Sequence, residues 1–225
     1  MNVAVLLQAW GPHYRTRGER IADGWVHAIG VSAGSVAALV LLGLALWRGG
    51  FGQATAVLIY GACLIVMLAC SAAYNLAQDE KVRALLRRFD HAAIFLMIAG
   101  SYTPFTTQRF EGAWALWMTV AVWALALVGA AGKLFLPGIS KKLWVPLYVA
   151  LGWIVVVAFD PLSDTVPRAG VILLAVGGAI YTLGVAFYVW ERLPYRRAIW
   201  HGFVLAAAGV HYSAILTGVV FAPLA

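Results

Sequence analysis

The stretch RRFDHAAIFLMIAGSYTPF, residues 87–105, places two arginines, a carboxylate and an imidazole directly before an apolar run. A charged side chain at the start of a membrane span is costly unless it is paired or has a function. We therefore expect Asp90 to belong to a site at a membrane boundary. The composition of the whole chain indicates whether such a boundary exists.

The composition is that of an integral membrane protein. Of the 225 residues, 63% are hydrophobic and only 11% are charged, which a soluble domain could not solvate. A helix needs about 20 mainly apolar residues to cross the hydrocarbon core, and the sequence contains seven such segments separated by short connections. We predict an all-α membrane protein, a single seven-transmembrane helix bundle. The predicted spans cover residues 24–47, 54–77, 89–107, 113–132, 143–160, 170–190 and 199–221.

The distribution of basic residues predicts the orientation of this bundle. Thirteen of the sixteen Lys and Arg residues lie on the side that holds the N-terminus, and cytoplasmic loops carry such an excess. We therefore expect a multi-pass protein of the plasma membrane, the bacterial inner membrane, with a cytoplasmic N-terminus and an external C-terminus. We attribute the net charge of +7 to this topology and to attraction by anionic lipid, and expect no nucleic-acid partner.

The first residues are distinct from the bundle. The opening MNVAVLLQAW is apolar but shorter than a span, and it has neither a basic region before it nor a cleavage signature after it. We interpret it as an interfacial segment rather than a signal peptide. The predicted organisation is an interfacial or cytoplasmic segment over residues 1–23, followed by the transmembrane domain over residues 24–225.

Polar residues from four places in the sequence share one depth in the predicted bundle. Glu19, Asp23 and His27 follow one another at intervals of four, so they lie on one helical face. Three other spans carry polar groups at the same level, within about two turns of the cytoplasmic boundary. We predict that they meet in one cavity that opens to the cytoplasm. The predicted cluster contains Glu19, Asp23, His27, Ser71, Asn75, Asp90, His91, Arg197 and His201.

Four stretches in this order, ERIADGWVH, SAAYN, RRFDHAAIFLMIAGSYTPF and AIWHGFVLAAAGVHY, resemble the haemolysin III branch of the progestin and adipoQ receptor family. The resemblance covers nearly the whole chain. It implies a seven-helix bundle with a topology opposite to that of G-protein-coupled receptors, and zinc held by three histidines near the cytoplasmic face. It also implies that Ser71 and Asp90 stand near the metal-bound water, and amide-lipid hydrolysis is the activity proposed for eukaryotic members.

The sequence departs from the family pattern at two of the three zinc ligands. Asn75 stands where the first histidine would be and Arg197 where the second would be, so His201 alone keeps its ligand position. An amide oxygen is a poor substitute for imidazole, and a guanidinium cannot ligate because it stays protonated. We therefore expect no tightly bound zinc as cofactor.

Two arrangements could replace the family's zinc site. One is a substitute metal site built from His27, His91, His201 and Asp90. The other, which we favour, uses the guanidinium of Arg197 as the missing cation, paired with Asp90 first and Glu19 second.

The corresponding functions belong to different classes. We predict a non-enzymatic membrane modulator, sensor or pore-forming, haemolysin-like protein, with the lipid bilayer as its partner and a lipid or fatty acid as the occupant of its cavity. The alternative is a zinc-dependent membrane hydrolase of a lipid amide, with Ser71 and Asp90 as catalytic residues. A retinal protein is excluded because all four lysines lie in predicted loops.

Overall fold

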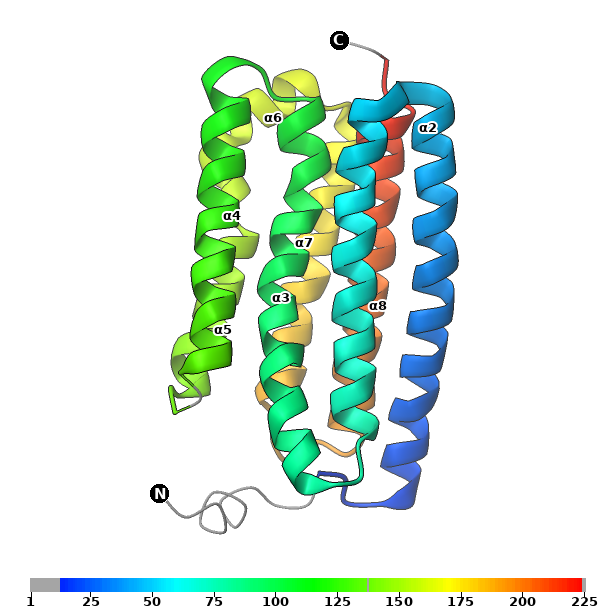
Figure 1. Ribbon diagram of the computed structural model, residues 1–225, viewed down its shortest axis with the longest axis vertical. Coiled ribbons are helices and arrows are strands. Elements are labelled where there is room, and N and C mark those ends of the chain that lie inside the picture. Colours follow the sequence, from blue (N-terminus) through cyan, green and yellow to red (C-terminus); the bar gives the residue numbers. More distant parts are fainter. Residues whose placement is uncertain (1–12, 137, 224–225) are drawn as a thin grey trace.

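The computed structural model describes residues 13–136 and 138–223. Within these ranges the chain forms helices joined by short connections, and it contains no strand. The interfacial segment expected for MNVAVLLQAW lies outside the described residues. The helices run along the long axis of an elongated bundle, and the first and last described residues lie at opposite ends of it (Figure 1).

The elements follow the apolar segments of the sequence, with some differences in extent. In chain order they are α2 (Arg17–Leu76), α3 (Glu80–Gln108), α4 (Gly112–Phe135), α5 (Lys141–Gly152), the 3₁₀ helix η1 (Ile154–Ala158), α6 (Phe159–Thr165), α7 (Arg168–Val189), α8 (Arg196–Ile215) and the π-helical turn η2 (Leu216–Val220). We call the end of the bundle where α2 begins the basic end.

Helix α2 is a hairpin of two antiparallel legs. Its helical geometry breaks at Gly50, where φ is 69° and ψ is −162°, a combination that only glycine adopts readily. The two legs then lie side by side (Figure 1). Small residues allow the close approach, because a β-carbon on Gly61 would lie 3.2 Å from that of Ala38. The turn is fastened to η2 by Gln53, whose side chain donates to the Val219 carbonyl at 3.0 Å.

Side-chain caps define where two of the site-bearing helices begin. The Thr16 hydroxyl accepts from the Glu19 amide at 3.1 Å, and the Asp79 carboxylate accepts from the Val82 amide at 2.9 Å. Such caps satisfy amide groups that have no partner within the helix. They start α2 and α3 before the apolar segments, so the polar residues predicted at the boundary fall inside regular helix.

The predicted span over residues 143–160 is not one regular helix. The structure divides it among α5, η1 and α6, with the break after Gly152. The Tyr102 hydroxyl lies at this break: it donates to the Gly152 carbonyl at 2.7 Å and accepts from the Val155 amide at 3.1 Å. Irregular backbone inside a membrane protein is tolerated only when its polar groups find such partners.

Among the described residues, five helical segments are long and apolar enough to cross a membrane: Arg17–Leu76, Gly112–Phe135, Lys142–Thr165, Arg168–Val189 and Arg196–Val220. The hairpin α2 counts once among them although two spans were expected there. Helix α3, which begins nine residues before its predicted span, is absent because its apolar part also contains Asp90, His91 and several hydroxyl-bearing residues, which lower its mean hydropathy. The fold is thus that of an all-helical membrane protein.

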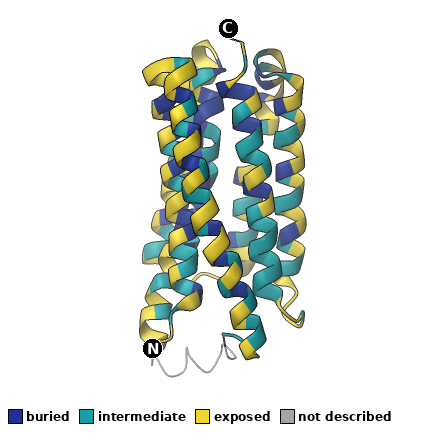
Figure 2. Cartoon of the chain, turned by 90° about the vertical axis from the view of Figure 1, so that its right-hand side faces the viewer, coloured by how far each residue is buried: buried dark blue, intermediate teal, exposed yellow. Residues whose placement is uncertain are grey.

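The burial pattern fits a lipid environment. Buried positions face the interior of the bundle and exposed ones face outward (Figure 2). The interior holds side chains such as Leu41, Tyr60 and Val122, none of which has solvent contact, whereas large apolar side chains such as Val128 and Val157 are 72% exposed. Extended apolar outer surface on this scale marks contact with a membrane.

Replacing Gly50 should destabilise the α2 hairpin. We expect Gly50→Ala to lower the free energy of unfolding by about 1–3 kcal/mol, because an L side chain is strained in this backbone conformation. The measurement is the thermal midpoint of the protein in detergent. Gly43→Ala is the matched control, because a β-carbon there meets no atom within 4 Å. Equal midpoints for the two variants would contradict the assigned turn.

Candidate functional site

A partly open cavity of about 1410 Å³ lies within the bundle. Its lining is polar at the basic end and apolar farther along, where it includes Phe105, Leu162 and Leu174. Asp90 and Phe105 both line it from α3, and at 1.5 Å per residue they are about 22 Å apart along the helix axis. The cavity is therefore elongated along the bundle, with one charged end.

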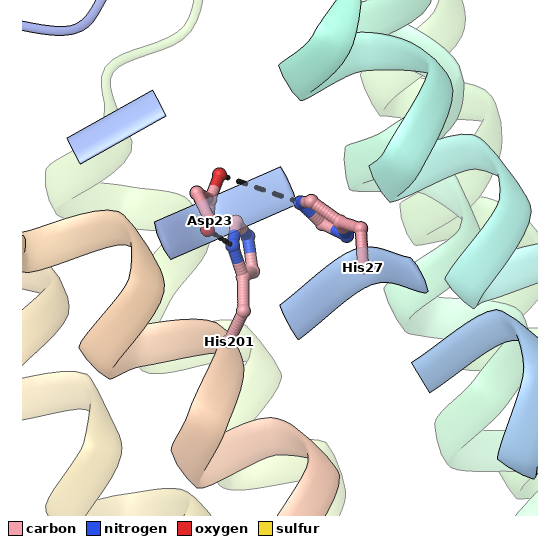
Figure 3. A group of neighbouring side chains, drawn as sticks. All are labelled: Asp23, His27 and His201. Atoms are coloured by element: carbon pink, nitrogen blue, oxygen red, sulfur yellow. Dashed lines mark hydrogen bonds and ion pairs between the residues drawn. The ribbon is translucent and has the colours of Figure 1, made fainter. Parts of the chain in front are cut away.

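Three side chains form a possible metal-binding triad at the basic end of the bundle. Asp23 and His27 come from successive turns of α2, and His201 comes from α8 (Figure 3). His201 Nδ1 lies 2.6 Å from Asp23 Oδ1, and His27 Nε2 lies 3.4 Å from Asp23 Oδ2. One ligand atom from each residue lies within 4.8 Å of the other two, so the three could hold one ion.

The triad is shielded from solvent. Asp23 has no exposed surface and His27 is 5% exposed, while His27 and His201 also line the cavity. Tyr14 contacts the triad from the N-terminal side, because its hydroxyl donates to Asp23 Oδ2 at 2.5 Å. Burial and the neighbouring Asp23 carboxylate raise the pKa of Tyr14 well above its ordinary value, so the phenol remains a hydrogen-bond donor.

Asn75 and Arg197, which stand where the family has two zinc-binding histidines, are hydrogen-bonded to each other. Asn75 donates to the Ser71 carbonyl at 3.0 Å, and its Oδ1 accepts from Arg197 Nη1 at 3.3 Å. Arg197 Nε donates to the His13 carbonyl at 2.9 Å. Burial, with Arg197 and Arg83 nearby, lowers the pKa of His13 to about 3, so this imidazole is neutral. The family's three-histidine zinc site does not fit these residues.

The predicted ion pair of Arg197 is wrong. In the described part of the chain no salt bridge joins it to Asp90 or to Glu19, because its guanidinium is used by neutral acceptors that lie closer. Glu19 instead accepts from the backbone amides of Arg15 at 2.8 Å and Tyr195 at 3.1 Å. Tyr195 has a left-handed backbone, with φ of 54°, so Glu19 fastens a strained turn before α8 to the start of α2.

The other predicted site residues lie along the same cavity. Ser71, Asp90 and His91 line it together with Asn75 and Arg197, and His91 Nε2 lies 3.9 Å from Asp90 Oδ2. In the substitute metal site considered from the sequence, His27 and His201 come together, but His91 and Asp90 do not join them. Asp23 is instead the third member of the group. Its spacing of four residues from His27 places both side chains on one helical face, and this spacing could have identified Asp23 as a metal ligand from the sequence.

Known proteins resemble the chain over most of its length. A family model described as Haemolysin-III related matches residues 17–212. The Hemolysin-3 homolog of Bacillus subtilis (strain 168) is 32% identical over 201 residues, which cover 88% of this chain and 93% of that protein. Hemolysin-3 of Bacillus cereus is 32% identical over 198 residues, covering 88% and 90%. Monocyte to macrophage differentiation factor of Homo sapiens is 28% identical over 163 residues, covering 70% and 67%. These matches confirm the resemblance seen in the sequence.

The contacts of Glu19 predict a pH-dependent stability. Burial alone would raise the pKa of Glu19, but the amides of Arg15 and Tyr195 outweigh it and hold the pKa below the ordinary 4.5. The ionised carboxylate therefore stabilises the fold above pH 4.5, and this contribution is lost as the pH falls through the lowered value. We expect Glu19→Gln to reduce the thermal midpoint by a few degrees at pH 7.

The control for this experiment is Glu111→Gln. Glu111 is exposed and makes no side-chain capping hydrogen bond at the start of α4, so its replacement should leave the midpoint unchanged. The difference between wild type and Glu19→Gln should shrink when the pH is lowered below 4.5. A difference that grew on acidification would show that the sign assigned to Glu19 is wrong.

Proposed function

The chain belongs to the haemolysin-III-related family, and from this membership and its cavity we propose that it is a seven-span membrane protein that binds a lipid or fatty acid without transforming it. In this arrangement the legs of α2 cross separately, α3, α4, α7 and α8 cross once each, and α5 with η1 and α6 makes one crossing. The basic end faces the cytoplasm and the C-terminus lies outside, as the positive-inside rule predicts. The membrane is the bacterial plasma membrane.

The cavity is the observation that carries this proposal. Pockets for small soluble ligands usually enclose about 300–1,000 Å³, whereas this one encloses about 1410 Å³. Its length of about 22 Å between Asp90 and Phe105 exceeds half the thickness of the hydrocarbon core, which is about 30 Å. A charged end joined to a long apolar part matches the chemistry of an amphiphile with one acyl chain.

The charge of the lining indicates which headgroup the cavity accepts. Basic side chains outnumber acidic ones there, so the polar end favours an anionic carboxylate or phosphate. The basic lining residues are Arg15, Arg83, Arg87, Arg88, Lys133, Arg196 and Arg197, and the acidic ones are Glu19, Glu80, Asp90 and Glu191. We propose that occupancy by such a lipid makes the protein a sensor or modulator of the membrane, and that the family's zinc position holds no metal.

A lipid amide hydrolase is the second candidate function. It is favoured by the presence of Ser71 and Asp90 in the lining of the same cavity as His27 and His201. Zinc, when bound, would supply a Lewis acid that polarises the amide carbonyl and activates water. In this function Asp90 would accept a proton and the Ser71 hydroxyl would orient the substrate carbonyl.

Filling the cavity should remove its lipid. Ala175 lines the cavity from α7, and Ala175→Trp would occupy the volume that an acyl chain needs. We expect the variant to retain several-fold less co-purified lipid than wild type, measured by extraction and mass spectrometry of the detergent-purified protein. Ala179→Trp is the matched control, because Ala179 is exposed on the same helix and outside the cavity lining. Equal lipid contents in both variants would refute the proposal.

Turnover distinguishes the two candidate functions. In vesicles containing an amide lipid, a binding protein should release no fatty acid above the background of the empty membrane. Release that depends on Asp90, and is lost in Asp90→Asn while the fold is retained, would favour the hydrolase.

The name Hemolysin-3 carried by the Bacillus relatives also motivates a dye-leakage assay on the same vesicles, and leakage that requires the protein would favour the pore-forming function.

A further inference from the structure

The imidazole of His27 has a buried nitrogen without a hydrogen bond. Its Nε2 atom is almost inaccessible and has no hydrogen-bond partner among the described residues, and its contact with Asp23 Oδ2 is an ion-pair distance of 3.4 Å. The His27 and His201 rings are 4.4 Å apart between centroids, so the unpartnered nitrogen points into the triad (Figure 3). A buried polar atom with no partner is rare in native proteins and calls for an explanation, such as an ion.

We propose that Asp23, His27 and His201 bind one zinc ion, at a site displaced from the family's three-histidine position. The displaced site shares only His201 with the family pattern. It takes its other two ligands from the first leg of α2 instead of from Asn75 and Arg197. This inference concerns metal binding alone and does not depend on whether a lipid occupies the cavity.

The donor set suits zinc. Two imidazole nitrogens and one carboxylate are common zinc ligands, and three protein ligands leave a fourth position for water or another molecule. Ligands about 2.0–2.1 Å from a tetrahedral ion lie about 3.3–3.4 Å from each other, which matches the 3.4 Å between His27 and Asp23. The 2.6 Å between His201 and Asp23 is a hydrogen-bond distance. Zinc would take the place of the shared proton, and the separation of the two groups would increase by less than 1 Å.

The surroundings support an ion at this place. The Tyr14 hydroxyl donates to Asp23 and thereby orients the carboxylate, as outer groups commonly do for metal ligands. The guanidinium of Arg197, one turn before His201 on α8, donates to the His13 carbonyl and to Asn75 rather than to the triad. The charge of Asp23 would offset part of the charge of the ion, and the two imidazoles bind it in their neutral form.

Metal content tests the proposal directly. Full-length protein is purified in detergent, treated with a chelator, incubated with Zn²⁺ and desalted, and zinc per chain is measured by mass spectrometry. We expect one zinc per wild-type chain and at least a tenfold loss in His27→Gln and in His201→Gln. Glutamine keeps much of the side-chain volume and hydrogen bonding but is a poor zinc ligand. His91→Gln is the matched control, because His91 lines the same cavity outside the triad, and it should keep its zinc.

A stability measurement separates loss of the site from loss of the fold. Zinc that binds the folded protein should raise the thermal midpoint of wild type and of His91→Gln, but not that of His27→Gln. Ala175→Trp should keep its zinc even if it loses its lipid, so failure of lipid binding and failure of metal binding are distinguishable. No zinc in wild type, zinc retained by His27→Gln, or equal loss in His91→Gln would each overturn the proposal.

Discussion

The arrangement of the basic end depends on one carboxylate, that of Asp23, which has no exposed surface. A buried ionised group is tolerated only when other groups compensate its lost hydration. Its partners are the Tyr14 hydroxyl and the His201 imidazole, with His27 one turn further along α2. Because these partners come from the N-terminal segment, α2 and α8, satisfying Asp23 fastens the start of α8 and the segment before α2 to the first turns of α2.

The same requirement for polar partners explains the irregular parts of the bundle. The chain breaks after Gly152, where the Tyr102 hydroxyl meets the freed backbone groups, and it reverses at Gly50, near which Gln53 is fastened to η2. At the first break a hydroxyl from α3 satisfies backbone groups that water cannot reach if the bundle lies in lipid. At the second, a side chain of α2 itself ties the turn to the C-terminal end of the bundle.

Hydropathy was sufficient to predict the helices, because a long apolar run in a chain of this composition has few other stable conformations. It could not predict the break in the segment over residues 143–160, since the stabilising hydroxyl of Tyr102 comes from another helix. The depth argument placed the polar residues at one level, but it could not choose among their partners. Arg197 illustrates this: Asn75 Oδ1 and the His13 carbonyl are closer to its guanidinium than the carboxylates favoured on charge alone, and only the folded chain shows this.

The replacements at the two family ligand positions form one unit rather than two independent losses. The Asn75 amide accepts from Arg197 and donates to Ser71. Each of Asn75 and Arg197 therefore supplies a hydrogen-bond partner for the other. Restoring a histidine at position 75 alone would remove one acceptor of the half-buried Arg197 guanidinium, and restoring one at position 197 alone would remove the donor to the buried Asn75 amide. Both intermediates carry the cost of an unsatisfied polar group, about 1–3 kcal/mol. The Asn75–Arg197 pair thus opposes single reversions, and the triad of Asp23, His27 and His201 is where metal chemistry could persist in this chain.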